Sequence, residues 1–322
     1  KIMVTKQKMV NLNNKKYILT SGCSFTNNVR LNPNNLKEED STRFSWPYYL
    51  QKELGKEYEV LNYGGATNDN VSLCRIFFYH TKRLIKEGVN PKDIIIIGQW
   101  SDPNRESIWI KSKFTEEDRE KYGHTLVYTP TWEKENGFFY LTGGFSPPDG
   151  EDSALKKYGI ENAIKYWEAD INWNNILNQV LHWLESWSHL ERYCKETQVN
   201  TYWMSMRNPY SVEAYECWFG APENDSTIPT KNLWFEKYEI LKPYIDELPI
   251  NKSNHWHYKN YNGLLEWTID NIQEGVPYFQ ESSGKYLSWE DYKKEIHEYG
   301  WGHPSPQMME KFVKEELINI IR

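Results

Sequence analysis

The fold is decided by one short stretch of sequence, Asp93-Ile94-Ile95-Ile96-Ile97-Gly98. A run of isoleucines leaves no polar face, and a strand buries both faces only where helices cover both sides of a parallel sheet. Isoleucine is also β-branched, which favours strands over helices. The stretch therefore predicts a central strand of a parallel sheet.

The chain before this strand alternates between strand and helix patterns. We expect strands over residues 17–20 and 58–62. One helix begins after Ser45, an N-cap candidate, and a second begins after Asn68 or Asp69. Strands and helices that alternate at this spacing form right-handed βαβ units. The pattern predicts an α/β fold, in which a parallel sheet lies between two helical layers as a three-layer α/β/α sandwich.

The pattern changes after Arg105. Residues 106–160 are rich in aromatic residues, Thr, Gly and Pro, and we interpret them as an insertion over the carboxyl edge of the sheet, with a hairpin near residues 138–141. Four further segments are expected: a helix over 160–197, a strand over 200–206, a second insertion or subdomain over 207–300, and a last amphipathic helix over 306–321. No repeat or linker divides the chain, so residues 1–322 are expected to form a single domain.

Composition excludes several classes of protein. The net charge is −7 and no basic cluster is present, which argues against nucleic acid as a partner. No apolar stretch is long enough to cross a membrane, and residues 1–16 lack the apolar core of a secretory signal, so we expect a cytoplasmic or virion-associated protein. The 15 Trp and 23 Tyr suit sugar rings, and equally protein interfaces and thick cores. The oligomeric state is left open.

A candidate nucleophile follows the first predicted strand, in Gly22-Cys23-Ser24-Phe25-Thr26. Ligands of open α/β folds bind at the carboxyl ends of the strands, and a glycine there permits a tight turn. We expect the Ser24 hydroxyl to face that edge, and Cys23 beside it to point into the core. The alternative is that Ser24 only caps the next helix.

Three more motifs fall at strand ends or before a helix. They are Asn62-Tyr63-Gly64-Gly65-Ala66-Thr67-Asn68, Gly98-Gln99-Trp100-Ser101-Asp102-Pro103-Asn104-Arg105, and Gly302-His303-Pro304-Ser305. A serine needs a base, and an imidazole such as His303 is the usual one. An oxyanion needs fixed donors, which the N–H groups of Ser24 and Gly65 and the Asn68 amide are placed to supply.

This order of motifs resembles the SGNH (GDSL-like) hydrolase family over the first 105 and the last 20 residues. The resemblance implies a three-layer, flavodoxin-like sandwich, with Ser24 as nucleophile, Gly65 as an oxyanion donor and His303 as base. The details look most like a little-studied bacterial and phage branch. They are Gly-Cys-Ser-Phe-Thr at residues 22–26, Ser-Trp-Pro at 45–47, Gly-x-x-Asn at 65–68, and Trp100-Ser101 with Arg105.

Two positions depart from the family pattern. Trp100 stands where the family has an oxyanion asparagine, and Asn68 or Ser101 are the possible substitutes, of which we favour Asn68. Gly300 stands where the family has the triad acid. Glu298, Glu295, Asp291 or a backbone carbonyl are the candidates to orient His303; otherwise Ser24 and His303 act as a dyad.

The functional expectation is a serine-dependent esterase that acts on a small acyl ester or removes O-acetyl groups from a glycan. Trp100, Ser101 and Arg105 are candidate substrate-binding residues. The alternatives are a non-catalytic binding or virion protein on the same scaffold, and an O-acyltransferase. No cofactor or metal is expected, since His255 and His257 lack a third ligand of clear spacing.

Overall fold

The fold is given by a computed structural model of the chain. It describes residues 15–23, 26, 45–65, 68–101, 103, 105, 107–110, 138–141, 176–210, 233, 236, 238–259, 261–271, 278–280, 285–287, 304 and 306–321. All structural statements below refer to these residues.

A parallel sheet forms the centre of the molecule. Its four strands are β1 (Lys16–Ser21), β2 (Tyr58–Asn62), β3 (Ile94–Trp100) and β6 (Asn200–Ser205), in the order β2-β1-β3-β6. Every residue of β3 is buried, as expected for a strand with neighbours on both edges and helices on both faces. The α/β fold predicted from the isoleucine run is confirmed.

Helices flank this sheet. The described α-helices are α2 (Trp46–Leu54), α3 (Asn70–Lys86), α7 (Ile176–Thr197), α10 (Lys242–Glu247), α11 (Leu264–Asn271), α13 (Pro306–Phe312) and α14 (Ile318–Ile321). A π-helical turn, Val313–Leu317, joins α13 to α14. Short 3-10 turns lie at Gly55–Glu57, Pro91–Asp93, Glu239–Leu241 and Pro249–Asn251.

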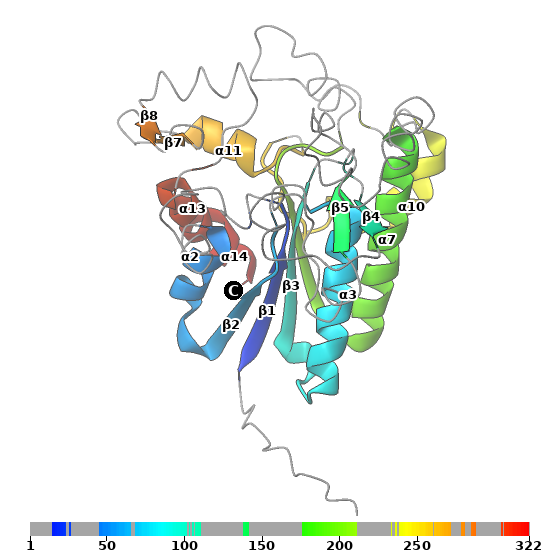
Figure 1. Ribbon diagram of the computed structural model, residues 1–322, viewed down its shortest axis with the longest axis horizontal. Coiled ribbons are helices and arrows are strands. Elements are labelled where there is room, and N and C mark those ends of the chain that lie inside the picture. The colour runs from blue at the N-terminus through cyan, green and yellow to red at the C-terminus, as the bar shows by residue number, and fades with distance from the viewer. Residues whose placement is uncertain are drawn as a thin grey trace, which may run out of the picture.

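Alternate side chains of the strands pack into two separate hydrophobic cores, one on each face of the sheet. Leu19 and Ile96 pack with α3 and α7, whereas Ile18 and Ile95 pack with α2, α11 and α13. This division follows from the strand geometry, because successive side chains point to opposite faces. Figure 1 shows α3 and α7 on one side of the sheet and α2, α13 and α14 on the other.

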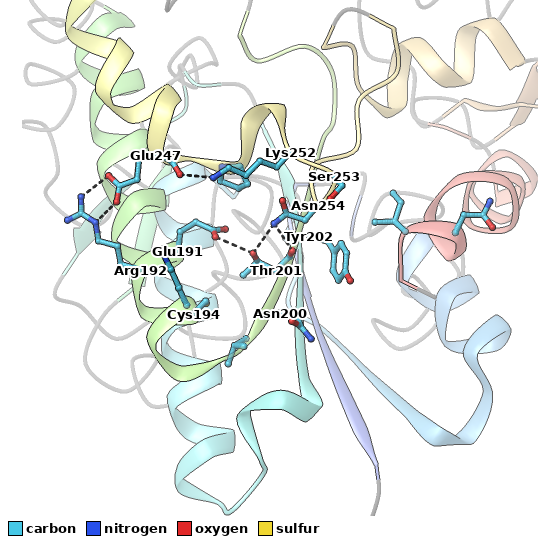
Figure 2. Close-up of a pocket in the computed structure, with 15 residues that line it drawn as sticks. Glu191, Arg192, Cys194, Asn200, Thr201, Tyr202, Glu247, Lys252, Ser253 and Asn254 are labelled. Atoms are coloured by element: carbon cyan, nitrogen blue, oxygen red, sulfur yellow. Dashed lines mark hydrogen bonds and ion pairs between the residues drawn. The ribbon is translucent and has the colours of Figure 1, made fainter.

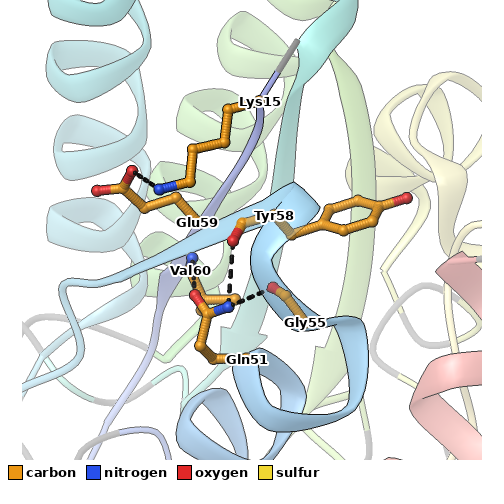
Figure 3. A network of polar contacts seen from close by, with 6 residues as sticks. All are labelled: Lys15, Gln51, Gly55, Tyr58, Glu59 and Val60. Carbon is orange, nitrogen blue, oxygen red and sulfur yellow. Dashed lines mark hydrogen bonds and ion pairs between the residues drawn. The ribbon is translucent and has the colours of Figure 1, made fainter. Parts of the chain in front are cut away.

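One carboxamide fixes α2 to the start of β2. Gln51 Nε2 donates to the carbonyl oxygens of Gly55 (2.8 Å) and Tyr58 (3.1 Å), and Gln51 Oε1 accepts from the Val60 N–H at 2.8 Å. Figure 3 shows this network beside the ion pair of Lys15 and Glu59. Gln51 therefore supports the amino end of β2, at the opposite end of that strand from the glycine-rich turn.

Several expected boundaries agree with the structure and some differ. The second strand spans the predicted residues, and Asp69 rather than Asn68 caps α3, since its carboxylate accepts from the Ser72 N–H at 2.8 Å. β3 continues two residues beyond Gly98, because it pairs with β6 up to Trp100. The last helix contains the π-helical turn that its amphipathic pattern did not indicate. Residues 160–175 of the predicted long helix lie outside the described part.

The two predicted insertions are described only in pieces. β5 (Phe138–Leu141) pairs antiparallel with β4 (Ser107–Ile110), and β7 (Tyr278–Gln280) pairs antiparallel with β8 (Lys285–Leu287). A strand is therefore present at the expected residues 138–141, although its partner precedes it by some thirty positions in sequence. The other residues of the first insertion lie outside the described part.

The free edge of β6 is partly covered by the second insertion. Trp203 N–H donates to the Asn254 carbonyl at 2.9 Å, and Trp203 O accepts from the Trp256 N–H at 2.8 Å. Residues 254–256 thus lie parallel to the carboxyl half of β6, which leaves its amino half open.

Candidate functional site

The strand order defines where a ligand site is expected. β1 lies between β2 and β3, so the chain moves to one side of β1 for β2 and crosses to the other side for β3. In open α/β sheets the crevice at such a reversal, outside the carboxyl ends of the strands, is the usual ligand site. The loops after β1, β2 and β3 carry three of the four motifs.

The turn after β1 is closely packed against β3. A side chain at Gly22 would overlap Thr26 and would bring its Cβ within 2.9 Å of Gln99 Cβ, so only glycine fits there. The Thr26 N–H donates to the Cys23 carbonyl at 2.9 Å. Ser24, the candidate nucleophile between these residues, lies outside the described part of the chain.

Cys23 points away from the sheet edge. Its side chain is fully buried, and its thiol lies 3.2 Å from Met206 Sδ in the core between the sheet and α13. The expectation that this cysteine belongs to the core is confirmed. A thiol in this position is not exposed to a substrate.

The glycine-rich turn after β2 is hydrogen-bonded to the turn after β1. Gly65 N–H donates to the Gly22 carbonyl at 3.0 Å, and Ser21 Oγ donates to the Tyr63 carbonyl at 3.1 Å. Two candidate site residues, Gly22 and Gly65, are thereby brought together. An oxyanion bound by Gly65 would have to share this N–H with the Gly22 carbonyl.

Asn68 lies directly against Gly65. A Cβ at Gly65 would lie 2.7 Å from Asn68 Oδ1, and the Asn68 N–H donates to the Gly65 carbonyl at 3.2 Å. The Asn68 carboxamide is buried, and its Nδ2 makes a long contact of 3.4 Å with the Tyr63 carbonyl. The amide proposed as an oxyanion donor therefore stands beside the backbone of the glycine turn.

The end of β3 carries the third motif. Trp100 is fully buried, and its ring stacks on Trp203 at 4.5 Å between centroids, in a cluster with Trp183 and Trp187. The ring thus packs in the core between the sheet and α7. The interpretation of Trp183 and Trp187 as core residues is confirmed by their burial.

Ser101 is held by the first residue of α3. Its N–H donates to Asn70 Oδ1 at 2.7 Å, and its carbonyl accepts from Asn70 Nδ2 at 3.0 Å. Arg105 is also buried, although it carries a charge. Ser101 and Arg105 therefore both lie inside the protein at the carboxyl end of β3.

Three consecutive side chains at this strand end have a buried polar atom that lacks a hydrogen-bond partner among the described residues. The atoms are Gln99 Nε2, Trp100 Nε1 and Ser101 Oγ. Buried donors are rarely left without a partner, and such groups are satisfied by ordered water or by a ligand. Gln99 lies within the third motif but was not singled out as a site residue from the sequence.

The fourth motif is largely outside the described residues. His303 lies outside them, as do Glu298, Glu295, Asp291 and Gly300. Pro304 is described and buried, and α13 begins two residues later.

A cavity of about 750 Å³ lies elsewhere, beside the open amino half of β6. Figure 2 shows Glu191 in it, accepting a hydrogen bond of 3.3 Å from the Thr201 hydroxyl, and Asn254 Nδ2 donating to the Thr201 carbonyl at 3.0 Å. Burial raises the pKa of Glu191. Glu247 lies on the rim with its pKa lowered to about 2 by hydrogen bonds from Arg192. Sequence reasoning gave no indication of this cavity.

His255 and His257 form a stacked pair with 4.0 Å between ring centroids. His257 Nε2 contacts the Ile250 carbonyl at 2.6 Å, and His255 Nε2 contacts the Tyr210 hydroxyl at 3.3 Å. Burial lowers the pKa of both imidazoles. Among the residues that the structure describes, no three His, Cys, Asp or Glu side chains lie close enough together to hold a metal ion.

Comparisons of the chain with protein-family models, with curated proteins and with solved structures found no match. None of the helices in the described part of the chain combines the length and the apolar character needed to span a membrane.

Proposed function

We propose that the protein is a serine-dependent ester hydrolase with a three-layer α/β/α sandwich of the SGNH type. The proposal is supported by the hydrogen bond of 3.0 Å from the Gly65 N–H to the Gly22 carbonyl. This bond joins the first and second motifs at the carboxyl edge of a parallel sheet, beside the strand-order reversal where ligands bind in such folds.

The proposed reaction is acyl transfer through the Ser24 hydroxyl. His303 takes the proton of that hydroxyl while Oγ attacks the ester carbonyl carbon. The tetrahedral intermediate collapses, the alcohol leaves with the proton from His303, and an acyl-enzyme remains. Water then attacks the acyl carbon with His303 as base, which releases the acid and restores Ser24.

The proposed oxyanion donors are the N–H groups of Ser24 and Gly65 and the Asn68 carboxamide. Gly65 and Asn68 are in contact, since the Asn68 N–H donates to the Gly65 carbonyl at 3.2 Å. The burial of Asn68 favours strong donation, because hydrogen bonds to a developing charge gain strength where water is excluded. Ser101 and Arg105, both buried beside β3, are the proposed contacts to the rest of the substrate.

The proposed substrate is a small acyl ester, in particular an O-acetyl group on a glycan, and the proposed setting is the cytoplasm or a virion. The choice of a glycan is motivated by the aromatic content of 16%, since flat aromatic faces suit sugar rings. With a sugar hydroxyl in place of water, the same site would act as an O-acyltransferase, and product analysis with a sugar acceptor separates the two reactions.

The test is the reactivity of Ser24. We expect the full chain to hydrolyse p-nitrophenyl acetate and to react covalently with a serine-directed phosphonate, and Ser24→Ala to lose at least about 10³-fold in kcat and all labelling. Ser253→Ala, an exposed serine at the distant cavity, is the matched control and should retain both. Full activity of Ser24→Ala would overturn the proposal.

A second candidate is a non-catalytic glycan-binding or virion component on the same scaffold. The observation that favours it is the cavity beside β6, whose lining mixes hydrogen-bond donors and acceptors with the ring of Tyr202, a combination that suits polyhydroxylated ligands. Absence of phosphonate labelling, together with glycan binding that is weakened by Asn254→Ala, would favour this candidate over the esterase.

A further inference from the structure

Gln99 occupies an unusual place for a glutamine. It is the last but one residue of β3, its side chain is fully buried, and it lies close against Gly22, just beyond the last residue pair of β1 and β3. Its carboxamide oxygen accepts a hydrogen bond of 2.6 Å from the Thr26 hydroxyl. Gln99 is therefore in contact with the residues on both sides of Ser24.

The nitrogen of this carboxamide donates no hydrogen bond to the described residues. Gln99 Nε2 is buried and has no hydrogen-bond partner among the described residues. Leaving a buried amide N–H unpaired destabilises a fold. The chain thus keeps a polar group at the position of a core side chain, and a ligand that accepts a hydrogen bond would remove the penalty.

Gln99 lies on the face of the sheet that packs against the last helical segment. Ile95 and Ile97, which share its alternation along β3, pack on the side of the sheet that α13 covers. His303 precedes α13 by only a few residues in sequence. The Gln99 side chain is accordingly on the face of the sheet that α13 covers.

We propose that Gln99 Nε2 is a further oxyanion donor, which acts together with Asn68 in place of the asparagine missing at position 100. The inference rests on the proposed esterase function. Trp100 does not provide this donor, because its indole packs on Trp203 in the opposite core. The Thr26 hydroxyl fixes the orientation of the carboxamide, so that its nitrogen is presented without reorganisation when negative charge develops on the substrate carbonyl.

The test compares three variants at this position and its partner. Gln99→Glu keeps the shape of the side chain and replaces its N–H donor by an acceptor. Gln99→Met removes the carboxamide. The double variant, Gln99→Met with Thr26→Val, also removes the hydroxyl that donates to the carboxamide. We expect each to lower kcat for p-nitrophenyl acetate by about 10²-fold to 10³-fold, with KM changed less than about twofold, because an oxyanion donor acts on the transition state. Phosphonate labelling of Ser24 should slow in parallel.

A stability measurement separates this role from a structural one. Gln51→Met is the matched control, since it removes a carboxamide that makes three hydrogen bonds far from the site, and we expect a lower Tm with kcat retained. The double variant at Thr26 and Gln99 should keep the wild-type Tm, because both partners of one hydrogen bond are removed together.

Two results would overturn the assignment. One is a wild-type kcat in Gln99→Met and Gln99→Glu, while Ser24→Ala is inactive; the proposed function then stands and only the role of Gln99 fails. The other is a fall in Tm of the double variant as large as that of Gln51→Met. A wild-type chain that neither hydrolyses the ester nor reacts with the phosphonate overturns the proposed function, and the assignment of Gln99 with it.

Discussion

Two glutamates act as anchors for pairs of tryptophans. Glu191 accepts hydrogen bonds from the indole nitrogens of Trp203 and Trp187. Glu316 accepts from Trp256 and Trp267, each at 3.1 Å. The first anchor ties α7 to β6, and the second ties the π-helical turn to the chain around α11. A carboxylate that accepts two buried N–H groups removes two desolvation penalties at once.

At the residue scale we therefore expect Glu191→Leu to be strongly destabilising. It leaves the Trp203 indole N–H unpaired inside the protein, which should lower the free energy of unfolding by about 2 kcal/mol. Urea denaturation followed by tryptophan fluorescence measures the change. Glu196→Leu, at an exposed position near the end of the same helix, is the control and should change stability by less than about 0.5 kcal/mol. Equal losses in the two variants would contradict the anchoring role.

The amino end of α3 is the element that connects the core to the candidate site. Asp69 caps the helix through the Ser72 N–H, and Asn70 forms two hydrogen bonds with the backbone of Ser101. One helix end thus holds the end of β3 and, through Asn68, contacts the glycine turn after β2. The site elements are positioned by hydrogen bonds to the backbone, two of them made by the Asn70 side chain.

At the element scale, Asn70→Ala should cost about 3 kcal/mol of stability. It leaves both the N–H and the carbonyl of Ser101 unpaired at a buried position, and each unpaired group costs about 1–3 kcal/mol. Asn90→Ala removes one exposed capping bond, to the Lys92 N–H, and should cost about 1 kcal/mol. Chemical denaturation of both variants checks the ranking. A loss for Asn70→Ala no greater than for Asn90→Ala would contradict the proposed connection.

Buried histidines make the stability of the whole molecule depend on pH. Burial lowers the pKa of His80 to about 4, with a further contribution from Arg83, and the ring stacks on Tyr63 at 3.6 Å between centroids. The unfolded chain takes up a proton near pH 6.5, whereas the folded chain resists it. The stability contributed by the neutral ring is therefore complete above pH 6.5 and is lost as the pH falls from 6.5 towards 4.

At the scale of the whole molecule, the free energy of unfolding should decrease between pH 7 and pH 5. His80→Phe keeps a flat ring against Tyr63 but cannot be protonated, so its stability should fall less steeply over the same range. Denaturation curves at intervals of half a pH unit measure both slopes. An identical slope for the two proteins would show that His80 does not contribute. The interval stays above the range in which Glu247, with its pKa lowered to about 2, loses its own contribution.

Much of the fold was predictable because its signals are local. The isoleucine run at residues 94–97 indicated β3, and the candidate N-caps indicated where α2 and α3 begin. The carboxyl end of β3 was predicted less accurately, and the last helix has the predicted limits but contains a π-helical turn that was not expected. β3 continues to Trp100 because β6 pairs with it there, and the π-helical turn lies where Glu316 contacts two tryptophans.

The candidate site was predictable in part. The sequence placed Gly22, Gly65 and Ser101 at strand ends, and the reversal of strand order brings those strand ends to one edge of the sheet. The roles of Ser24 and His303 remain predictions. Gln99 and Asn70 were not identified, because a buried carboxamide is distinguished from an exposed one only by the side chains that surround it.

The sequence by itself determined the α/β class, because the patterns that indicate apolar strands and capped helices each involve residues close together in the chain. Only the tertiary structure decided the order β2-β1-β3-β6, the stacking of Trp100 on Trp203, and the contact of Gln99 with Thr26. The physical reason is the distance along the chain. Hydrogen bonds and ring contacts between residues far apart along the chain depend on which strands become neighbours, and no local pattern encodes that choice.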